Sequence, residues 1–283
     1  MPNRDSSNPD LIFAIIGCTL LQPFFMNILV FDIETIPDVR TGEKLYDLKS
    51  LSDEDIAKVM YAKRVQKTGG SDFLPHHLHK VVAISVVLKT SSGLNVWSLG
   101  KEDSDEKDLV ERFFDGIERF TPTLVSWNGG GFDLPVLHYR AMLHGIDAHH
   151  YWENGDEIRD FRYNNYLSRY HWRHIDLMDV VAGFNLRSAA PLDEVAVMLG
   201  FPGKLGMSGA AVWDTYLEGG LKAIRDYCET DVLNTYLVYL RWELTRGTFS
   251  QSQYDSQIEE VQSWLAEAEG DHFDQFLSAW KSN

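Results

Sequence analysis

The sequence predicts a single α/β domain built on a mixed β-sheet that is flanked by helices. Short apolar runs typical of buried strands alternate along the chain with longer segments of helical, amphipathic spacing. Two β-rich runs, 80–90 and 94–100, are separated by Ser-Ser-Gly, which predicts a hairpin and therefore an antiparallel pair. A hairpin followed by alternating helices and strands indicates a sheet with both antiparallel and parallel neighbours.

The first predicted strand covers residues 27–32, and a polar, charge-mixed insertion follows it over 38–79. Within the insertion, acidic residues after Ser52 and basic residues before Thr68 predict a helix over 52–67. Ser52 suits the N-cap, and the two sets of charges suit the two ends of the helix dipole.

The remaining elements follow the hairpin. Apolar residues at helical spacing predict an amphipathic helix over 104–120, and "TLVSWN" (123–128) predicts a short buried strand. Four further segments are predicted: a helix through 134–145, a strand end with a helix over 174–184, a helix over 192–200 and a long helix over 219–247.

Composition limits the classes of function. The 283 residues include 26 basic and 42 acidic side chains, a formal charge of −16. This charge argues against a protein that holds nucleic acid mainly through a broad basic face, although divalent metals and a local basic groove could still carry such a contact. Two cysteines, Cys18 and Cys228, allow no disulfide framework beyond one bridge, so we expect a cytoplasmic protein.

The two ends of the chain differ from its middle. Residues 11–25 are uncharged and mostly apolar, but they are short for a membrane span and lack the basic flank of a signal peptide. We expect residues 1–25 to be a disordered extension or a start-site artefact, with no stable membrane association; a membrane anchor is the alternative. Residues 248–283 form an acidic, helical tail that is expected to pack on the domain 26–247 or to bind a protein partner, and it carries Trp264, Phe273, Phe276 and Trp280.

Asp32 and Glu34 stand one residue apart where the first strand is expected to end. Side chains alternate along a strand, so both carboxylates point to one face. Two like charges held together raise a pKa or attract a cation. An isolated Asp-x-Glu is also common at a solvated strand end, so a metal site requires partners elsewhere in the chain.

The segment 126–137 supplies a second candidate group. Its three consecutive glycines permit a sharp turn that brings backbone amides close to a ligand. Asp133 then begins a helix, where it is either a metal ligand or an ordinary N-cap. Asn128 and Phe132 add an amide and a ring suited to sugar–phosphate contact and base stacking.

The third group lies on the long helix. Tyr227 and Asp231 are four residues apart and emerge on one face, although such pairs are frequent on ordinary helices. Together with Asp32, Glu34 and Asp133, Asp231 makes a cluster of oxygen donors that suits Mg²⁺ or Mn²⁺ rather than Zn²⁺. Two such ions about 4 Å apart stabilise the attacking and leaving oxygens of a phosphoryl displacement.

The three groups resemble a known set of motifs. Asp-x-Glu at 32–34, Asn-x₃-Phe-Asp at 128–133 and Tyr-x₃-Asp at 227–231 are similar to the motifs of the DEDDy branch of the DEDD 3′→5′ exonuclease superfamily, which has a ribonuclease H-like fold. The likeness is greatest to predicted 3′→5′ exonucleases related to the proofreading domain of family B DNA polymerases. It covers 27–245, including "HKVVAIS", "PGKLGMSG" and "DYCETDVLNTYLVYLR". Asp226 stands where the histidine branch has its histidine.

The resemblance implies a 3′→5′ exonuclease that uses two Mg²⁺ or Mn²⁺ ions on the 3′ ends of single-stranded nucleic acid, DNA in preference to RNA, with a role in DNA repair. It implies that Asp32 bridges both metals, that Glu34 and Asp231 complete the nucleophile-side site, and that Asp133 supports the second. Tyr227 would orient the attacking water, because a tyrosine near its usual pKa of about 10 is a poor base at neutral pH.

Other residues receive weaker assignments. Substrate contacts are expected from Thr35, Asn128, Phe132 and Lys204, with a plain exposed loop lysine as the alternative for Lys204. His174 and Asp176 are better explained by a buried, hydrogen-bonded histidine than by a metal ligand. Two rival functions stay open: a non-catalytic nucleic-acid-binding or scaffold protein on the same fold, and a ribonuclease H-type endonuclease, against which the Tyr227 motif speaks.

Overall fold

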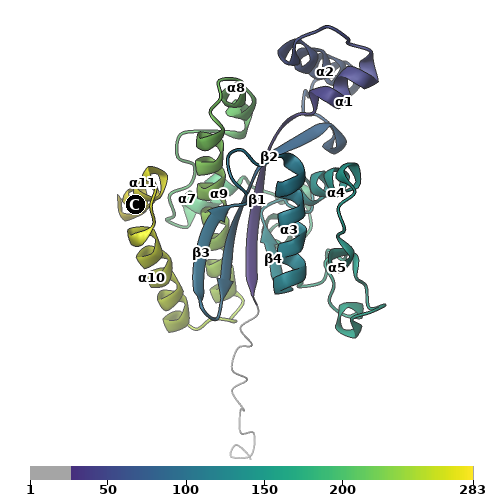
Figure 1. The fold of residues 1–283 in the computed structure, drawn as a ribbon. Helices are drawn as coiled ribbons and strands as arrows, with labels where there is room; N and C mark the ends of the chain where they lie inside the picture. Colours follow the sequence, from purple (N-terminus) through teal and green to yellow (C-terminus); the bar gives the residue numbers. More distant parts are fainter. Residues whose placement is uncertain (1–26, 283) are drawn as a thin grey trace, which may run out of the picture.

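The computed structural model describes residues 27–282, so the predicted extension 1–25 lies outside the described residues. Five strands form one mixed sheet in the order β3-β2-β1-β4-β5, with helices on both faces (Figure 1). The strands are β1 (Ile28–Pro37), β2 (His79–Thr90), β3 (Gly93–Ser98), β4 (Thr123–Ser126) and β5 (His174–Asp176). β1, β2 and β3 pair antiparallel, whereas β4 pairs parallel with β1 and β5. The predicted single-domain α/β class, with a mixed sheet flanked by helices, is confirmed.

Strand β1 is the centre of the sheet and is covered on both faces. Val30 faces one hydrophobic cluster, whereas Leu29 and Phe31 face the other, which explains its continuous apolar run. The strand was expected to end at residue 32, and this boundary is wrong: pairing with β2 continues to Pro37. Asp32 and Glu34 therefore lie within the strand, and a register shift follows Glu34.

Three helices cover one face of the sheet. They are α3 (Glu106–Phe120), α4 (Asp133–His144) and α5 (His149–Trp152). The predicted helix over 104–120 is confirmed as α3, which begins after Asp105, because the Asp105 carboxylate accepts a hydrogen bond from the Asp108 amide. The buried core on this face joins the apolar side of α3 and α4 to β1, β2 and β4.

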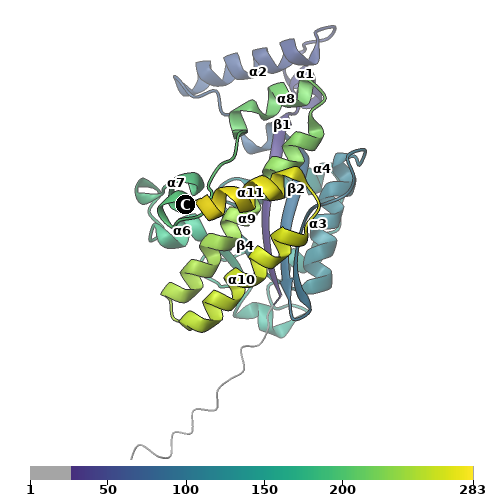
Figure 2. The same cartoon turned by 90° about the vertical axis from the view of Figure 1, so that its left-hand side faces the viewer.

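The other face is covered by the long helix α9 (Leu221–Thr245). The tail helices α10 (Gln251–Glu267) and α11 (Asp271–Ser282) pack beside α9 (Figure 2). Of the four aromatic residues noted in the tail, Phe273 and Phe276 belong to the same buried hydrophobic cluster as α9, and Trp264 and Trp280 pack against it. The tail thus packs on the domain, the first of its two expected arrangements. The remaining helices are α6 (Leu177–Val181), α7 (Leu192–Met198) and α8 (Val212–Leu217), with 3₁₀ turns at His76–Leu78, Arg159–Arg162, Leu186–Ser188 and Gly209–Ala211.

The insertion forms a small subassembly that projects beyond one end of the sheet (Figure 1). Helix α2 (Asp53–Thr68) confirms the predicted helix, and the Ser52 hydroxyl caps it by accepting from the Asp55 amide. Helix α1 (Val39–Tyr46) was not predicted. It packs on α2 where Gly42 meets Met60 so closely that a Cβ at Gly42 would lie 2.3 Å from the Met60 sulfur.

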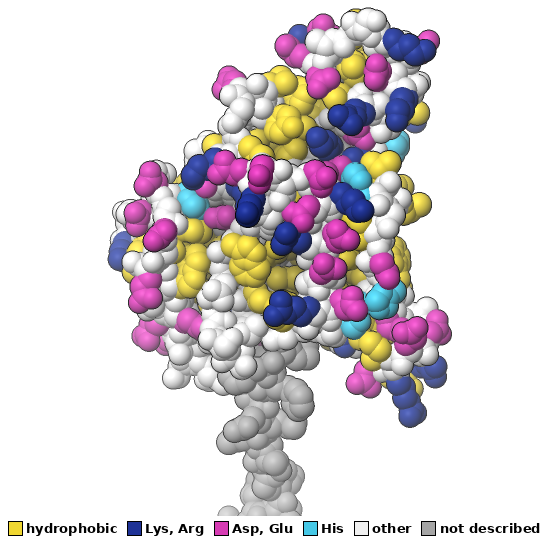
Figure 3. All heavy atoms as spheres, viewed as in Figure 1, with side chains coloured by type: hydrophobic (Ala, Val, Ile, Leu, Met, Phe, Trp, Pro, Cys, Tyr) yellow, Lys and Arg dark blue, Asp and Glu magenta, His cyan; other side chains and the backbone are white. Residues whose placement is uncertain are grey.

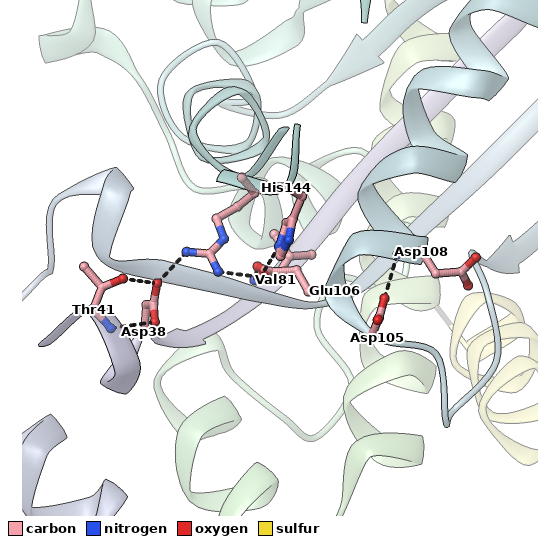
Figure 4. A network of polar contacts seen from close by, with 8 residues as sticks. Asp38, Thr41, Val81, Asp105, Glu106, Asp108 and His144 are labelled. Atoms are coloured by element: carbon pink, nitrogen blue, oxygen red, sulfur yellow. Dashed lines mark hydrogen bonds and ion pairs between the residues drawn. The ribbon is translucent and has the colours of Figure 1, made fainter. Parts of the chain in front are cut away.

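A buried ion-pair network joins the insertion to the domain; we call it the arginine cluster and define it as Asp38, Glu106, Arg140 and His144 (Figure 4). Arg140 donates to Asp38 Oδ2 at 2.6 Å and also to Glu106 Oε2. Glu106 Oε2 additionally contacts His144 Nε2 at 2.9 Å, and Glu106 Oε1 accepts from the Val81 amide at 2.6 Å. The network links the start of α1 to α3, α4 and β2.

The distribution of charged side chains on the surface agrees with the excess of acidic over basic residues in the sequence. On the face seen in Figure 1, Lys and Arg side chains occur singly or in small groups among Asp and Glu, and they form no continuous basic face (Figure 3). Among the described residues, no helix is both long and apolar enough to cross a membrane.

Candidate active site

Asp32 and Glu34 point from β1 toward helix α9, as the two-residue period of a strand predicts. Cys228 of α9 meets them: its sulfur lies 3.5 Å from Asp32 Oδ2, and ligand atoms of the three residues lie within 4.8 Å of one another. Sequence reasoning missed Cys228 here. The available signal was its position three residues before Asp231, which places both on one face of a helix.

Asp133, on helix α4, reaches β1 beside Asp32 and Glu34. It is the first residue of α4, and its Oδ1 accepts a hydrogen bond from the Ile33 amide at 3.2 Å. The N-cap position belongs to Phe132, which provides no side-chain cap. The N-cap explanation for Asp133 is therefore wrong, because its carboxylate is fastened to β1 between Asp32 and Glu34.

The glycine loop that delivers Asp133 is held by Asp176. The two carboxylate oxygens of Asp176 accept from the Asn128 and Gly130 amides, each at 2.9 Å. Asn128 has a positive φ of 65°, a conformation that asparagine tolerates. A Cβ at Gly129 would lie 2.3 Å from Ser126 Oγ, so glycine is required there. Asp176 thus acts as an anchor for the loop.

His174, beside this loop, behaves as a structural histidine. Its Nε2 lies 2.9 Å from Ser126 Oγ, and burial lowers its pKa to about 4. The contact agrees with the buried, hydrogen-bonded histidine favoured from the sequence.

Tyr227 and Asp231 complete the site from α9. Both side chains are buried, and Asp231 Oδ1 has no hydrogen-bond partner in the described part of the chain. Lys204 stands above them with its Nζ 5.6 Å from the centre of the Tyr227 ring. Its loop is fixed because Asn234 Nδ2 donates to the Gly203 carbonyl at 2.8 Å while the Gly203 amide donates back to Asn234 Oδ1 at 3.2 Å.

The site holds a strong excess of negative charge. We call Asp32, Glu34, Asp133 and Asp231 the carboxylate cluster. Burial, and then repulsion from the other three carboxylates, raises the pKa of Asp32 well above its usual value, and burial with repulsion from Asp231 and Asp133 does the same for Glu34. Burial also raises the pKa of Asp133 to about 7 and that of Asp231 to about 6. Lys204 opposes these shifts only in part.

A cleft of about 600 Å³ opens over the cluster. Asp32, Asp231, Asn128 and Lys204 line it, together with Trp127 and the segment 189–194. The cleft is large enough to admit a small ligand or a nucleotide unit, and pockets of roughly 300–1,000 Å³ are typical of ligand sites.

Thr35 and Phe132 lie outside the lining of this cleft. The Thr35 hydroxyl lies 2.9 Å from Nδ1 of His79, whose Nε2 contacts the Leu74 carbonyl at 3.1 Å. The Phe132 ring packs on His79 and on the exposed Phe73, with centroids 5.1 and 5.5 Å away. Of the four predicted substrate contacts, the structure thus brings Asn128 and Lys204 into the cleft and places the other two against the insertion.

The arrangement fits divalent metal ions. Four carboxylates that are mutually repelled, together with a buried oxygen of Asp231 that has no partner among the described residues, form a donor set that a cation would satisfy. Oxygen donors of this kind suit Mg²⁺ or Mn²⁺.

A mixed sheet that carries such a cluster is typical of the metal-dependent nucleases. The chain belongs to the family described as predicted 3′-5′ exonuclease related to the exonuclease domain of PolB, whose model matches residues 71–280. The match begins after Asp32 and Glu34 and extends past residue 245, where the likeness was expected to end, through α10 and into α11.

Several known proteins resemble parts of the chain. The DNA polymerase epsilon catalytic subunit of Aspergillus fumigatus is 28% identical over 145 residues, which is 50% of this chain and 6% of that protein. The corresponding protein of Saccharomyces cerevisiae is 44% identical over 46 residues, 16% of this chain and 2% of that protein. The chain therefore spans only a small part of these relatives. A solved family B DNA polymerase from Pyrobaculum calidifontis aligns with a TM-score of 0.47 at 19% identity, covering 89% of this chain and 27% of that chain.

Proposed function

We propose that the protein is a 3′→5′ exonuclease that hydrolyses phosphodiester bonds at the 3′ ends of single-stranded nucleic acid by a two-metal-ion mechanism. The observation that carries the proposal is the carboxylate cluster: four acids from β1, α4 and α9 repel one another with too little positive charge to balance them. Two of them, Asp32 and Asp231, line the cleft. Membership of an exonuclease family supports the same activity.

The carboxylate cluster, with Asp32 as its central member, would hold two Mg²⁺ or Mn²⁺ ions. When bound, such ions lower the pKa of an attacking water and neutralise the charge that develops on the phosphate. The chain itself contributes position: the Ile33 amide fixes Asp133, and the loop anchored by Asp176 holds the start of α4 against β1.

Tyr227 is assigned an orienting role. Burial, and then repulsion from Asp231 and Glu34, raises the pKa of its phenol well above the usual range, so the hydroxyl stays protonated at neutral pH. A protonated hydroxyl can donate or accept a hydrogen bond, but it cannot remove a proton from water. We therefore assign Tyr227 to holding the attacking water in line with the scissile bond.

Substrate contacts follow from the cleft. Lys204 would meet a phosphate and Asn128 a sugar or phosphate oxygen, while Phe132 and Thr35 would border the path of the strand on the insertion side. Similarity to the catalytic subunits of a DNA polymerase favours DNA over RNA as the substrate. A role in DNA repair and a cytoplasmic location stay predictions.

The test is digestion of 5′-labelled single-stranded DNA and matched RNA with Mg²⁺, with Mn²⁺ and with chelator, beside an Asp32→Ala control. The expected result is a metal-dependent ladder of single-nucleotide steps on DNA that disappears in the control. Internal cuts would indicate an endonuclease instead. A folded, metal-loaded protein that binds both strands without cutting them would support the non-catalytic binding protein.

A further inference from the structure

Cys228 places a soft donor among hard ones. Its side chain is fully buried, and its sulfur lies 3.5 Å from both the Oδ2 and the carbonyl oxygen of Asp32. Glu34 completes a set of three ligand atoms within 4.8 Å of one another. Zn²⁺ binds sulfur at about 2.3 Å and oxygen at about 2.1 Å, which in a tetrahedral site separates two ligand atoms by roughly 3.5 Å. The Cys228 sulfur and Asp32 Oδ2, which a hydrogen bond from the thiol joins at 3.5 Å, are already close to this spacing, and the three ligand atoms together lie within 4.8 Å of one another.

A second observation points to a cation at the same place. Asp231 is three residues beyond Cys228 on α9, and its Oδ1 is buried with no hydrogen-bond partner among the described residues. Asp32 and Asp231 both line the cleft, so an ion has a path to the cluster. Asp231 is near enough to repel both Asp32 and Glu34 electrostatically, although it lies outside the set of three ligand atoms within 4.8 Å of one another.

We propose that Asp32, Glu34 and Cys228 form a binding site for a thiophilic divalent cation, Zn²⁺ or Cd²⁺, that competes with the ions of the hydrolytic reaction. Sulfur ligands select such cations, whereas Mg²⁺ and Mn²⁺ have little affinity for sulfur. On binding, the S–H bond breaks, the metal–sulfur bond forms and the proton passes to solvent. The competition, though not the site, rests on the proposed function, because Asp32 and Glu34 are shared.

The test is a titration of the full chain with Cd²⁺, followed by the ultraviolet charge-transfer absorption of a cadmium–thiolate bond. One equivalent of Cd²⁺ should produce this band in the wild type and equally in Cys18→Ser, whose substitution lies outside the described residues. Cys228→Ser should lose the band and bind Cd²⁺ at least about 100-fold more weakly, since even residues that only support a metal ligand contribute 10–100-fold.

Asp32→Asn is the second variant, which keeps the thiol and tests the shared carboxylate. It should retain the band at saturation but bind Cd²⁺ at least about tenfold more weakly. Unchanged affinity in Asp32→Asn, a band that survives in Cys228→Ser, or no band in the wild type would each overturn the site.

The ratio of hydrolysis with and without Cd²⁺, measured in Mg²⁺, tests the competition separately. Inhibition should be strong in the wild type and at least about tenfold weaker in Cys228→Ser. Equal inhibition of the two proteins would overturn the competition. Because the absorption band does not depend on turnover, a failure of the proposed hydrolysis leaves the cation site testable, and a missing band leaves Mg²⁺-dependent hydrolysis untouched.

Discussion

Two groups of buried carboxylates in this protein differ in how their charge is balanced. In the arginine cluster, Arg140 bonds both acids, and burial, which alone would raise the pKa of Asp38, is outweighed by hydrogen bonds from Arg140 and Thr41 that lower it. In the carboxylate cluster, burial and mutual repulsion act in the same direction, and Lys204 opposes them only in part.

The difference separates a structural site from a functional one. A balanced buried pair holds elements together, and breaking it leaves an isolated charge. An unbalanced cluster costs stability in the metal-free protein, because its charged form is disfavoured, and a bound cation recovers that cost. The same residue types thus fasten the insertion in one place and form the proposed metal site in the other.

The largest expected effect comes from removing one charge of the carboxylate cluster. Asp32→Asn should lower hydrolysis roughly 1000-fold, equivalent to about 4 kcal/mol, because metal-ion catalysis is lost. At pH 8 without divalent metal, the variant should be at least as stable as the wild type, because repulsion is relieved. Rates and urea unfolding measure the two effects. A variant that is less stable and still active would remove the contrast between the clusters.

The arginine cluster should respond in the opposite way. Arg140→Met leaves Asp38 and Glu106 without their cation, so the free energy of unfolding in urea should fall by about 3–5 kcal/mol. Arg112→Met is the matched control, because Arg112 pairs with Asp108 on the exposed surface of α3 and its loss should change stability little. Equal effects of the two substitutions would show that the buried network does not hold the insertion.

The periodicity of strands and helices in the sequence predicted part of the candidate site. The two-residue period of a strand correctly paired Asp32 with Glu34, and the four-residue spacing on a helix correctly paired Tyr227 with Asp231. The cap at Ser52 was also predictable, because its donors lie within one turn.

Long-range contacts were not accessible in this way. Asp133 bonds the Ile33 amide across 100 residues, and Arg140 bonds Asp38 across 102. No local pattern encodes such partners. For the same reason the capping explanation of Asp133 failed. Helix α1 was missed although its N-cap is local: the Asp38 carboxylate accepts a hydrogen bond from the Thr41 amide at 3.1 Å.

The pH dependence of stability should have opposite signs in the two clusters. Asp133 has a pKa of about 7 in the folded protein and about 3.9 when unfolded, so its protonated form stabilises the fold below pH 4 and this stability is lost as pH rises to 7. The metal-free protein should lose about 2 kcal/mol between pH 5 and pH 7 from this group. Asp38, whose pKa is lowered, should instead cost stability only as pH falls below about 4.

Urea unfolding with chelator and with saturating Mg²⁺, at intervals from pH 5 to pH 8, measures these slopes. Mg²⁺ should flatten the loss above pH 5, because a bound cation favours the ionised carboxylates. Asp133→Asn should flatten it without metal. A slope that neither Mg²⁺ nor this substitution changes would assign the pH dependence to residues outside the carboxylate cluster.

The smallest expected effect on turnover comes from Tyr227, a neutral group beside the carboxylate cluster. Tyr227→Phe removes the hydroxyl that is proposed to orient water but removes no charge, so turnover should fall roughly tenfold, about 1.4 kcal/mol, while metal affinity is kept. Tyr236→Phe, on the same helix and also buried but in the core cluster, should leave turnover unchanged. Normal turnover in Tyr227→Phe would remove the tyrosine from the mechanism. Lost metal affinity would instead show that Tyr227 holds Asp231. Turnover and metal affinity, measured together, therefore distinguish a residue that positions the water from one that positions a metal ligand.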